Sequence, residues 1–186
     1  MAGADNLVKE CEEKMKRSVS LIQQELAGIR TGRASAGLVE HLKVDYYGNL
    51  TPLKQMASVS VPDAKTIEIR PWDKNAGAAI EKAISTSDLK LAPQRQGDVI
   101  RLNLPPLTEE RRGEFLKLAK KVTEDGRVAI RNVRHETNNK LKAAKDQGLS
   151  DDDLRKLTGA VQKLTDTYIA KVDELLAGKE REIRTI

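Results

Sequence analysis

Cysteine, histidine and aromatic residues are all scarce in this 186-residue sequence. The single cysteine, Cys11, has no partner within the chain for a disulfide, and its apolar helical position predicts a small buried side chain. His41 and His135 lie far apart and outside any ligand-spaced motif, so we expect no metal site. Aromatic residues make up 3% of the chain, which argues against a base-stacking surface for single strands.

Long apolar runs and catalytic motifs are absent as well. No run approaches the roughly eighteen apolar residues that span a bilayer, and the N-terminal stretch MAGADNLVKE lacks the apolar region of a secretory signal. The sequence has no glycine-rich phosphate loop and no paired nucleophile and base, so we predict a protein that is not an enzyme and needs no cofactor. We expect a cytoplasmic monomer. A mature organellar protein without its targeting peptide stays an alternative.

Positive charge is concentrated in one segment. The chain carries a net charge of +5, and residues 108–145 hold eleven Lys and Arg against six acidic residues. Helical spacing there predicts one long amphipathic helix whose apolar face is formed by Phe115, Leu118, Val122, Ala129 and Val133. Arg127, Arg131 and Arg134 fall within about 60° of one another, roughly opposite that face. This basic face fits a phosphate-rich partner better than an acidic peptide. The alternative is an ordinary solvated face that pairs with Glu124 and other residues one helical turn away.

Two further segments carry helical periodicity, at residues 4–29 and from Ser150 onward. Ser150 followed by three aspartates is a favourable helix start. Because none of the three amphipathic helices can bury its apolar face alone, residues 1–30 and 106–186 are expected to form a three-helix bundle.

The middle of the chain predicts a small β/α/β domain at residues 31–105, which makes the fold α+β. Alternating apolar residues predict strands at 42–47, 50–53, 57–61, 66–70 and 99–104, with a helix at 75–86, an extended piece at 88–91 and a turn at 94–97. Two connections would join the domains and act as a hinge. The hinge residues are Arg30, Thr31, Gly32 and Arg33 on one connection and Leu104, Pro105 and Pro106 on the other.

Short motifs distributed over nearly the whole chain resemble those of the ribosome recycling factor family. They include Arg30–Ser35, Val44–Gly48, Pro71–Lys74, Pro105–Arg112, Val128–Arg134 and Gln162–Asp166. The resemblance implies an L-shaped protein that binds the post-termination ribosome. With elongation factor G and GTP, such a factor promotes dissociation into subunits and release of mRNA and tRNA, without hydrolysing anything itself.

The resemblance also implies which residues contact large-subunit ribosomal RNA: Arg131 and Arg134, with Arg30 and Arg33 near the corner of the molecule. Arg127 joins this set through its helical spacing alone. Lys90 stands where the family commonly has glycine, a departure at the turn after Leu89. A helical scaffold or RNA chaperone that works without a motor protein is the competing interpretation.

Overall fold

The computed structural model describes residues 2–185 of the chain. It contains three long helices, α1 (Ala2–Ala27), α3 (Glu109–Lys145) and α4 (Asp151–Arg184). The chain divides into two compact units. The first unit comprises the described residues up to Gln23 together with Ala119–Lys179, and the second comprises Gln24–Leu118 with the residues from Glu180 onward.

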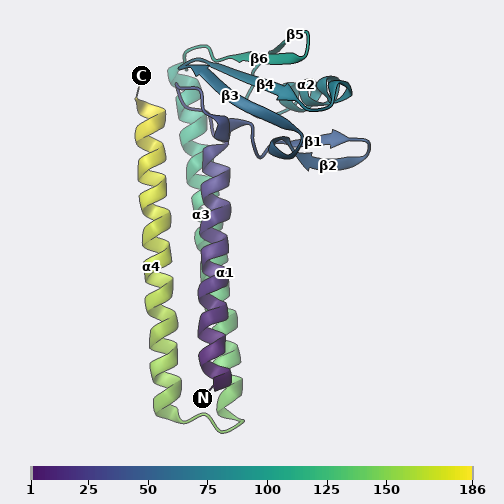
Figure 1. The fold of residues 1–186 in the computed structure, drawn as a ribbon. Coiled ribbons are helices and arrows are strands. Elements are labelled where there is room, and N and C mark those ends of the chain that lie inside the picture. The colour runs from purple at the N-terminus through teal and green to yellow at the C-terminus, as the bar shows by residue number, and fades with distance from the viewer. Residues whose placement is uncertain (1, 186) are drawn as a thin grey trace. The chain divides into compact units, whose positions relative to one another are not determined.

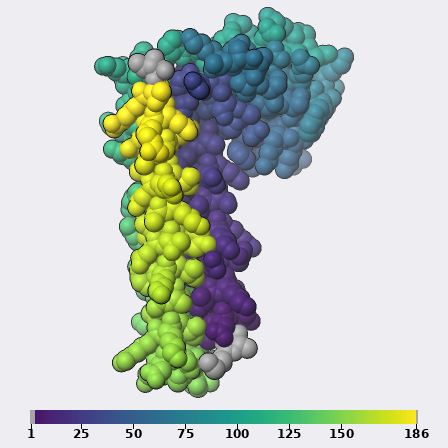
Figure 2. Space-filling model, turned by 60° about the vertical axis from the view of Figure 1, so that its left-hand side comes forward, coloured from purple at the N-terminus to yellow at the C-terminus, as the bar shows by residue number. Residues whose placement is uncertain are grey.

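In the first unit α1, α3 and α4 pack side by side as a three-helix bundle (Figure 1). Each helix contributes fully buried apolar side chains: Met15 from α1, Ile130 and Leu141 from α3, and Val161 and Val172 from α4. Lys14 of α1 pairs with Glu136 of α3, and Tyr168 of α4 donates a hydrogen bond to Glu12 of α1. Figure 2 shows α4 and α1 next to each other on one face of this unit.

The buried face of α3 differs from the predicted one. Its centre follows Ala119, Thr123, Gly126, Ile130, Thr137 and Leu141. Thr123 and Thr137 are buried because each hydroxyl donates to a backbone carbonyl four residues earlier, so neither loses a hydrogen bond. Glycine and threonine carry no apolar signal, and the predicted face was therefore rotated about the helix axis. The three arginines flank the buried face on the side of α4 and do not lie opposite it.

The second unit contains a four-stranded antiparallel sheet and a separate hairpin. The sheet has the order β3 (Ala57–Asp63), β4 (Thr66–Pro71), β6 (Val99–Asn103) and β5 (Pro93–Gln96). The hairpin pairs β1 (Lys43–Tyr46) with β2 (Asn49–Pro52). The helix α2 (Gly77–Ser85) contributes Ile80 and Ile84 to the core beneath the sheet. Three short 3₁₀ helices lie at Ala36–Leu38, Leu53–Gln55 and Lys74–Ala76.

The α+β prediction, with long helices and a small sheet domain, is confirmed. Two details of the sheet prediction were wrong. Residues 94–97 were predicted as a turn, but Pro93–Gln96 is an edge strand, and the turn follows at Gly97, which has φ +62°. Residues 88–91 were predicted to be extended, but they belong to a loop in which Lys90 adopts φ +51°.

No helix among the described residues is long and apolar enough to cross a membrane.

Candidate nucleic-acid interface

The three predicted arginines of α3 lie in the first unit along the side that faces α4, but their surroundings differ. Arg127 is mostly covered, with 18% of its side chain exposed, whereas 46% of the Arg131 side chain is exposed. Arg134 is partly buried. Because exposure and bonding partners decide which guanidinium can reach a phosphate, each arginine has to be considered separately.

Arg127 is held by two carboxylates. Its Nε and Nη2 donate to Asp173 Oδ1 of α4, at 2.9 and 2.6 Å, and its Nη1 donates to Glu124 Oε2 at 2.9 Å. Although burial opposes its charge, these bonds raise the pKa of Arg127. With Nε, Nη1 and Nη2 all engaged by these carboxylates, Arg127 fits a structural role that joins α3 to α4.

Arg131 has one ionic partner, since its Nη1 lies 3.2 Å from Glu124 Oε1. The two oxygens of Glu124 therefore contact two arginines. Hydrogen bonds from Arg127 and then from Arg131 lower the pKa of Glu124, so this carboxylate is charged at neutral pH. The Arg131–Glu124 pair is exposed, and such pairs separate easily when a better partner arrives.

Arg134 makes no ion pair within residues 2–185. Its Nη1 lies 3.5 Å from Oε1 of Gln162 on α4, a neutral partner at the limit of hydrogen bonding. Gln162 in turn donates to Asp166 Oδ1 at 2.9 Å, which aims the amide oxygen towards Arg134. Among the described residues no carboxylate therefore competes with an external anion for the guanidinium of Arg134.

Arg30 and Arg33 belong to the second unit and have opposite environments. Arg30 is buried, with 6% of the residue exposed, and its Nη2 donates to the carbonyl of Pro105. Burial and then the charge of Arg111 lower the pKa of Arg30. Arg33 is exposed. Of the two, the structure places only Arg33 where RNA can reach it directly, although both were predicted to bind RNA.

The predicted hinge residues form two neighbouring connections within the second unit. The Arg30–Pro105 hydrogen bond links one connection to the other. Leu104 is buried and its N–H donates to the carbonyl of Lys65 at 2.8 Å, while Pro105 and Pro106 are exposed. Gly32 has no positive φ, and a Cβ there would lie 3.7 Å from the carbonyl oxygen of Thr185, so the backbone at this position does not require glycine.

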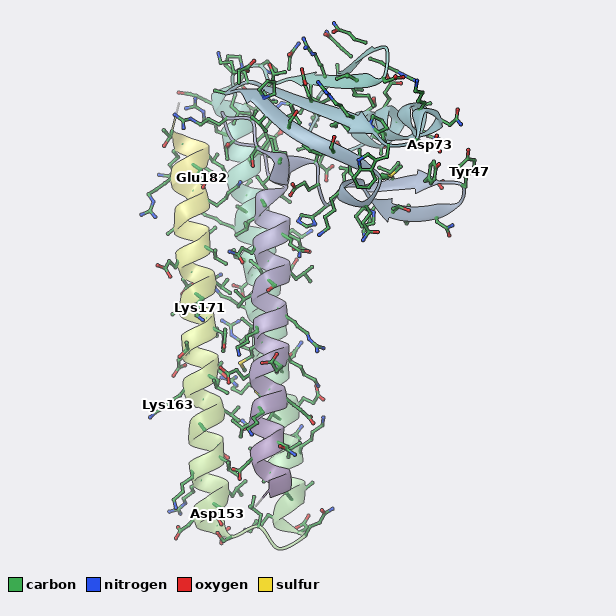
Figure 3. The ribbon with its side chains drawn as sticks, in the orientation of Figure 1. Tyr47, Asp73, Asp153, Lys163, Lys171 and Glu182 are labelled. Carbon is green, nitrogen blue, oxygen red and sulfur yellow. The ribbon has the colours of Figure 1, made fainter. Side chains whose placement is uncertain are left out.

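Glu124 was expected as a partner in the solvated-face interpretation, whereas the carboxylate of Asp173 and the amide of Gln162 were missed by sequence reasoning. Only the spacing of Glu124 and Arg127, three residues apart on one helix, offered a signal. Asp173 and Gln162 become partners through the packing of α4 on α3. On α4, Lys163 projects away from the bundle (Figure 3) and Lys171 lies over the ring of Tyr168, with Nζ 4.7 Å from its centroid. Within residues 2–185, no cluster of three or more His, Cys, Asp or Glu side chains is arranged to hold a metal.

Comparison with known proteins decides the family. The sequence model of the ribosome recycling factor family matches residues 22–183. The chain belongs to this family. It is 50% identical over 183 residues to the ribosome-recycling factor of Oleidesulfovibrio alaskensis, covering 98% of this chain and all of the relative. It is also 50% identical over 184 residues to that of Geobacillus kaustophilus, with the same coverage.

Solved structures agree with this assignment. The solution structure of a ribosome recycling factor has a TM-score of 0.73 and 46% identity, and the match covers 98% of each chain. A second match, with a TM-score of 0.64, 46% identity and coverage of 98% and 99%, comes from models for the T. thermophilus ribosome recycling factor and the E. coli elongation factor G bound to the E. coli post-termination complex.

Family membership confirms the resemblance seen in the sequence. Ribosome recycling factors are ribosome-binding, non-enzymatic factors of protein biosynthesis, so the prediction that the chain is not an enzyme is confirmed.

Proposed function

We propose that this chain binds the post-termination ribosome through the α3 side that faces α4, with Arg131 and Arg134 contacting phosphates of large-subunit ribosomal RNA. With elongation factor G and GTP it then promotes dissociation into subunits and release of mRNA and tRNA. The observation that supports the RNA contact is the state of these two guanidiniums. One has a single exposed, exchangeable carboxylate partner and the other has only a neutral amide.

The physical basis is the pairing of guanidinium groups with phosphates on a rigid helix. Two NH donors of one arginine match two phosphate oxygens, and the helix fixes the spacing between successive arginines. Contacts of this kind position a protein on folded RNA without reading its bases, and they weaken as salt rises. The relative bound to a post-termination complex supports binding of the post-termination ribosome by this chain.

The proposed mechanism needs two domains that can move relative to each other. One comprises residues 1–30 and 106–186, the other comprises residues 31–105, and they are joined at 30–33 and 104–106. Elongation factor G would push the ribosome-bound assembly, and rotation at the two connections would transmit this force to the contacts between the ribosomal subunits. The hydrogen bond from Arg30 to the carbonyl of Pro105 supports a mechanical role for Arg30, because it ties the two connections together. We propose that the chain acts as a monomer in the cytoplasm, where bacterial ribosomes end each round of translation.

Light scattering of post-termination ribosomes tests the proposal, because it reports splitting directly, and titrating the protein in this assay gives its affinity for the ribosome. Arg131→Ala and Arg134→Ala should each weaken ribosome binding roughly tenfold, the usual cost of losing a charge-assisted contact. Arg155→Ala is the matched control, since Arg155 is exposed on α4 and makes no described ion pair. Unaltered binding of both α3 variants, with the fold intact, would refute the RNA contact.

The same assay separates recycling from an RNA-chaperone activity. Splitting should require elongation factor G and GTP, whereas a chaperone would act without them. Gly32→Val tests the hinge, because a Cβ at this position makes only an ordinary contact in the fold, while the β-branched side chain restricts the backbone. This variant should bind ribosomes normally and split them more slowly. Normal splitting would argue against a hinge at 30–33.

A further inference from the structure

Glu124 occupies an unusual position among the α3 arginines, since within residues 2–185 it is the one acidic residue that contacts two of them. Its Oε2 accepts from Arg127 at 2.9 Å, and its Oε1 accepts from Arg131 at 3.2 Å. The carboxylate thus presents two oxygens to two guanidiniums, the arrangement that a bridging phosphate would also use. The pair is reached by solvent, with about half of the Glu124 side chain exposed.

The two arginines depend on Glu124 to different degrees. Arg127 also donates twice to Asp173, so it keeps its position when Glu124 is removed. Arg131 has no other described partner, so the bond to Glu124 is the described interaction that positions its guanidinium. A change at Glu124 therefore alters the availability of Arg131 without dismantling the contact between α3 and α4.

We propose that Glu124 acts as an internal substitute for an RNA phosphate: it occupies Arg131 in the free protein and gives it up when the ribosome binds. The proposal rests on the proposed function, because it assumes that Arg131 contacts phosphate. Glu124 is then a positioning residue whose charge lowers ribosome affinity. Lower affinity is useful to a recycling factor, since the factor has to leave the ribosome after each round.

The competing effect of Glu124 would be to hold Arg131 ready in its bound orientation, which would raise affinity. Competition between Glu124 and the phosphate for Arg131 should affect ribosome affinity more than this orienting effect, because the bond to Glu124 has to break before Arg131 can pair with a phosphate. An exposed ion pair also restricts the long arginine side chain only weakly. The carboxylate left beside the phosphate then repels it, which adds to the cost.

The test compares Glu124→Gln with Asp125→Asn in ribosome binding. Both changes remove one negative charge from neighbouring positions of α3, but Asp125 is exposed and contacts neither arginine through any described bond. Glu124→Gln should tighten binding about three- to tenfold. It should also steepen the dependence of log K on log salt by up to about 0.9. Asp125→Asn should change affinity less than about twofold. Equal effects of the two variants would overturn the proposal.

A double-mutant cycle shows whether Glu124 acts through Arg131. In an Arg131→Ala background Glu124→Gln should no longer tighten binding, because the group it competes for is gone. Equal tightening in both backgrounds would mean that Glu124 repels the RNA directly, and would also overturn the proposal. The two failures are distinguishable: if Arg131→Ala alone leaves binding unchanged, the proposed RNA contact fails. If Arg131→Ala weakens binding and Glu124→Gln does not tighten it, only the role of Glu124 fails.

Discussion

Arg127 of α3 and Asp173 of α4 are joined by two hydrogen bonds, with Arg127 Nε and Nη2 lying 2.9 and 2.6 Å from the same carboxylate oxygen, Oδ1. The sequence grouped Arg127 with Arg131 and Arg134 as one RNA-binding set. The ion pair divides that set into one residue that holds two helices together and two that do not: Arg131 pairs with one exposed carboxylate, and Arg134 contacts a neutral amide. Function and stability should therefore separate among these three arginines.

Asp173→Asn should destabilise the first unit. The change leaves Arg127 partly buried with one carboxylate fewer, and we expect a loss of about 0.5–1 kcal/mol in the free energy of unfolding. Urea denaturation followed by circular dichroism measures it. Glu174→Gln removes the same charge from the next position of α4, where Glu174 is exposed and makes no described ion pair, and should leave stability unchanged. Equal losses in both variants would show that net charge, rather than the ion pair, is responsible.

Helical periodicity predicted the three long helices to within a few residues, but it did not predict how α3 is rotated about its axis. A wheel drawn from apolar residues omits Thr123 and Thr137, which are buried because their hydroxyls bond to the helix backbone. Asp173 lies 46 residues from Arg127, so their contact depends on the packing of α4. Local spacing contains no information on such a pair.

The edge strand β5 was missed for a related reason. Pro93–Gln96 is polar and largely exposed, and it pairs only with β6, so it shows no alternation of apolar residues. The strand predicted at 42–47 lies at Lys43–Tyr46, because the turn that follows it is Tyr47-Gly48, with φ +49° and +82°. The predicted domain boundaries, at 30/31 and 105/106, stay predictions.

Gly126 of α3 gives the bundle room for Ile22 of α1. A Cβ at this position would overlap Cδ1 and Cγ1 of Ile22, whose side chain is 2% exposed and has little space to move. Gly126→Ala should therefore destabilise by about 1–3 kcal/mol, although alanine is the better helix former. Gly159→Ala is the matched control on α4, where a Cβ meets nothing within 4 Å, and it should stabilise by up to about 1 kcal/mol. Thermal unfolding of both variants decides whether packing or propensity dominates at Gly126.

Glu136 should make stability depend on pH in the acidic range. Bonds from Lys140 and then from Lys14 lower the pKa of Glu136 to about 2. Because the folded-state pKa lies below the unfolded value, near 4.3, the stabilisation is complete above the unfolded pKa and is lost as the pH falls towards 2. Glu136→Gln should thus be less stable than wild type at pH 7, and most of this difference should be gone at pH 2. Urea denaturation at several pH values measures the difference. A gap that persists unchanged at pH 2 would contradict this origin.

Lys90 carries a strained backbone in the loop between α2 and β5. Its φ of +51° lies in the left-handed region, which costs a residue with a Cβ roughly 1–2 kcal/mol. Lys90→Gly should therefore stabilise the second unit, and we expect about 0.5–1 kcal/mol because glycine loses more entropy on folding. Lys90→Ala separates strain from charge: it removes the ammonium group, 4.0 Å from Glu114, but keeps the Cβ, so it should not stabilise. Thermal unfolding compares the three proteins, and equal gains for glycine and alanine would show that the ammonium group, not the backbone, limits stability at this position.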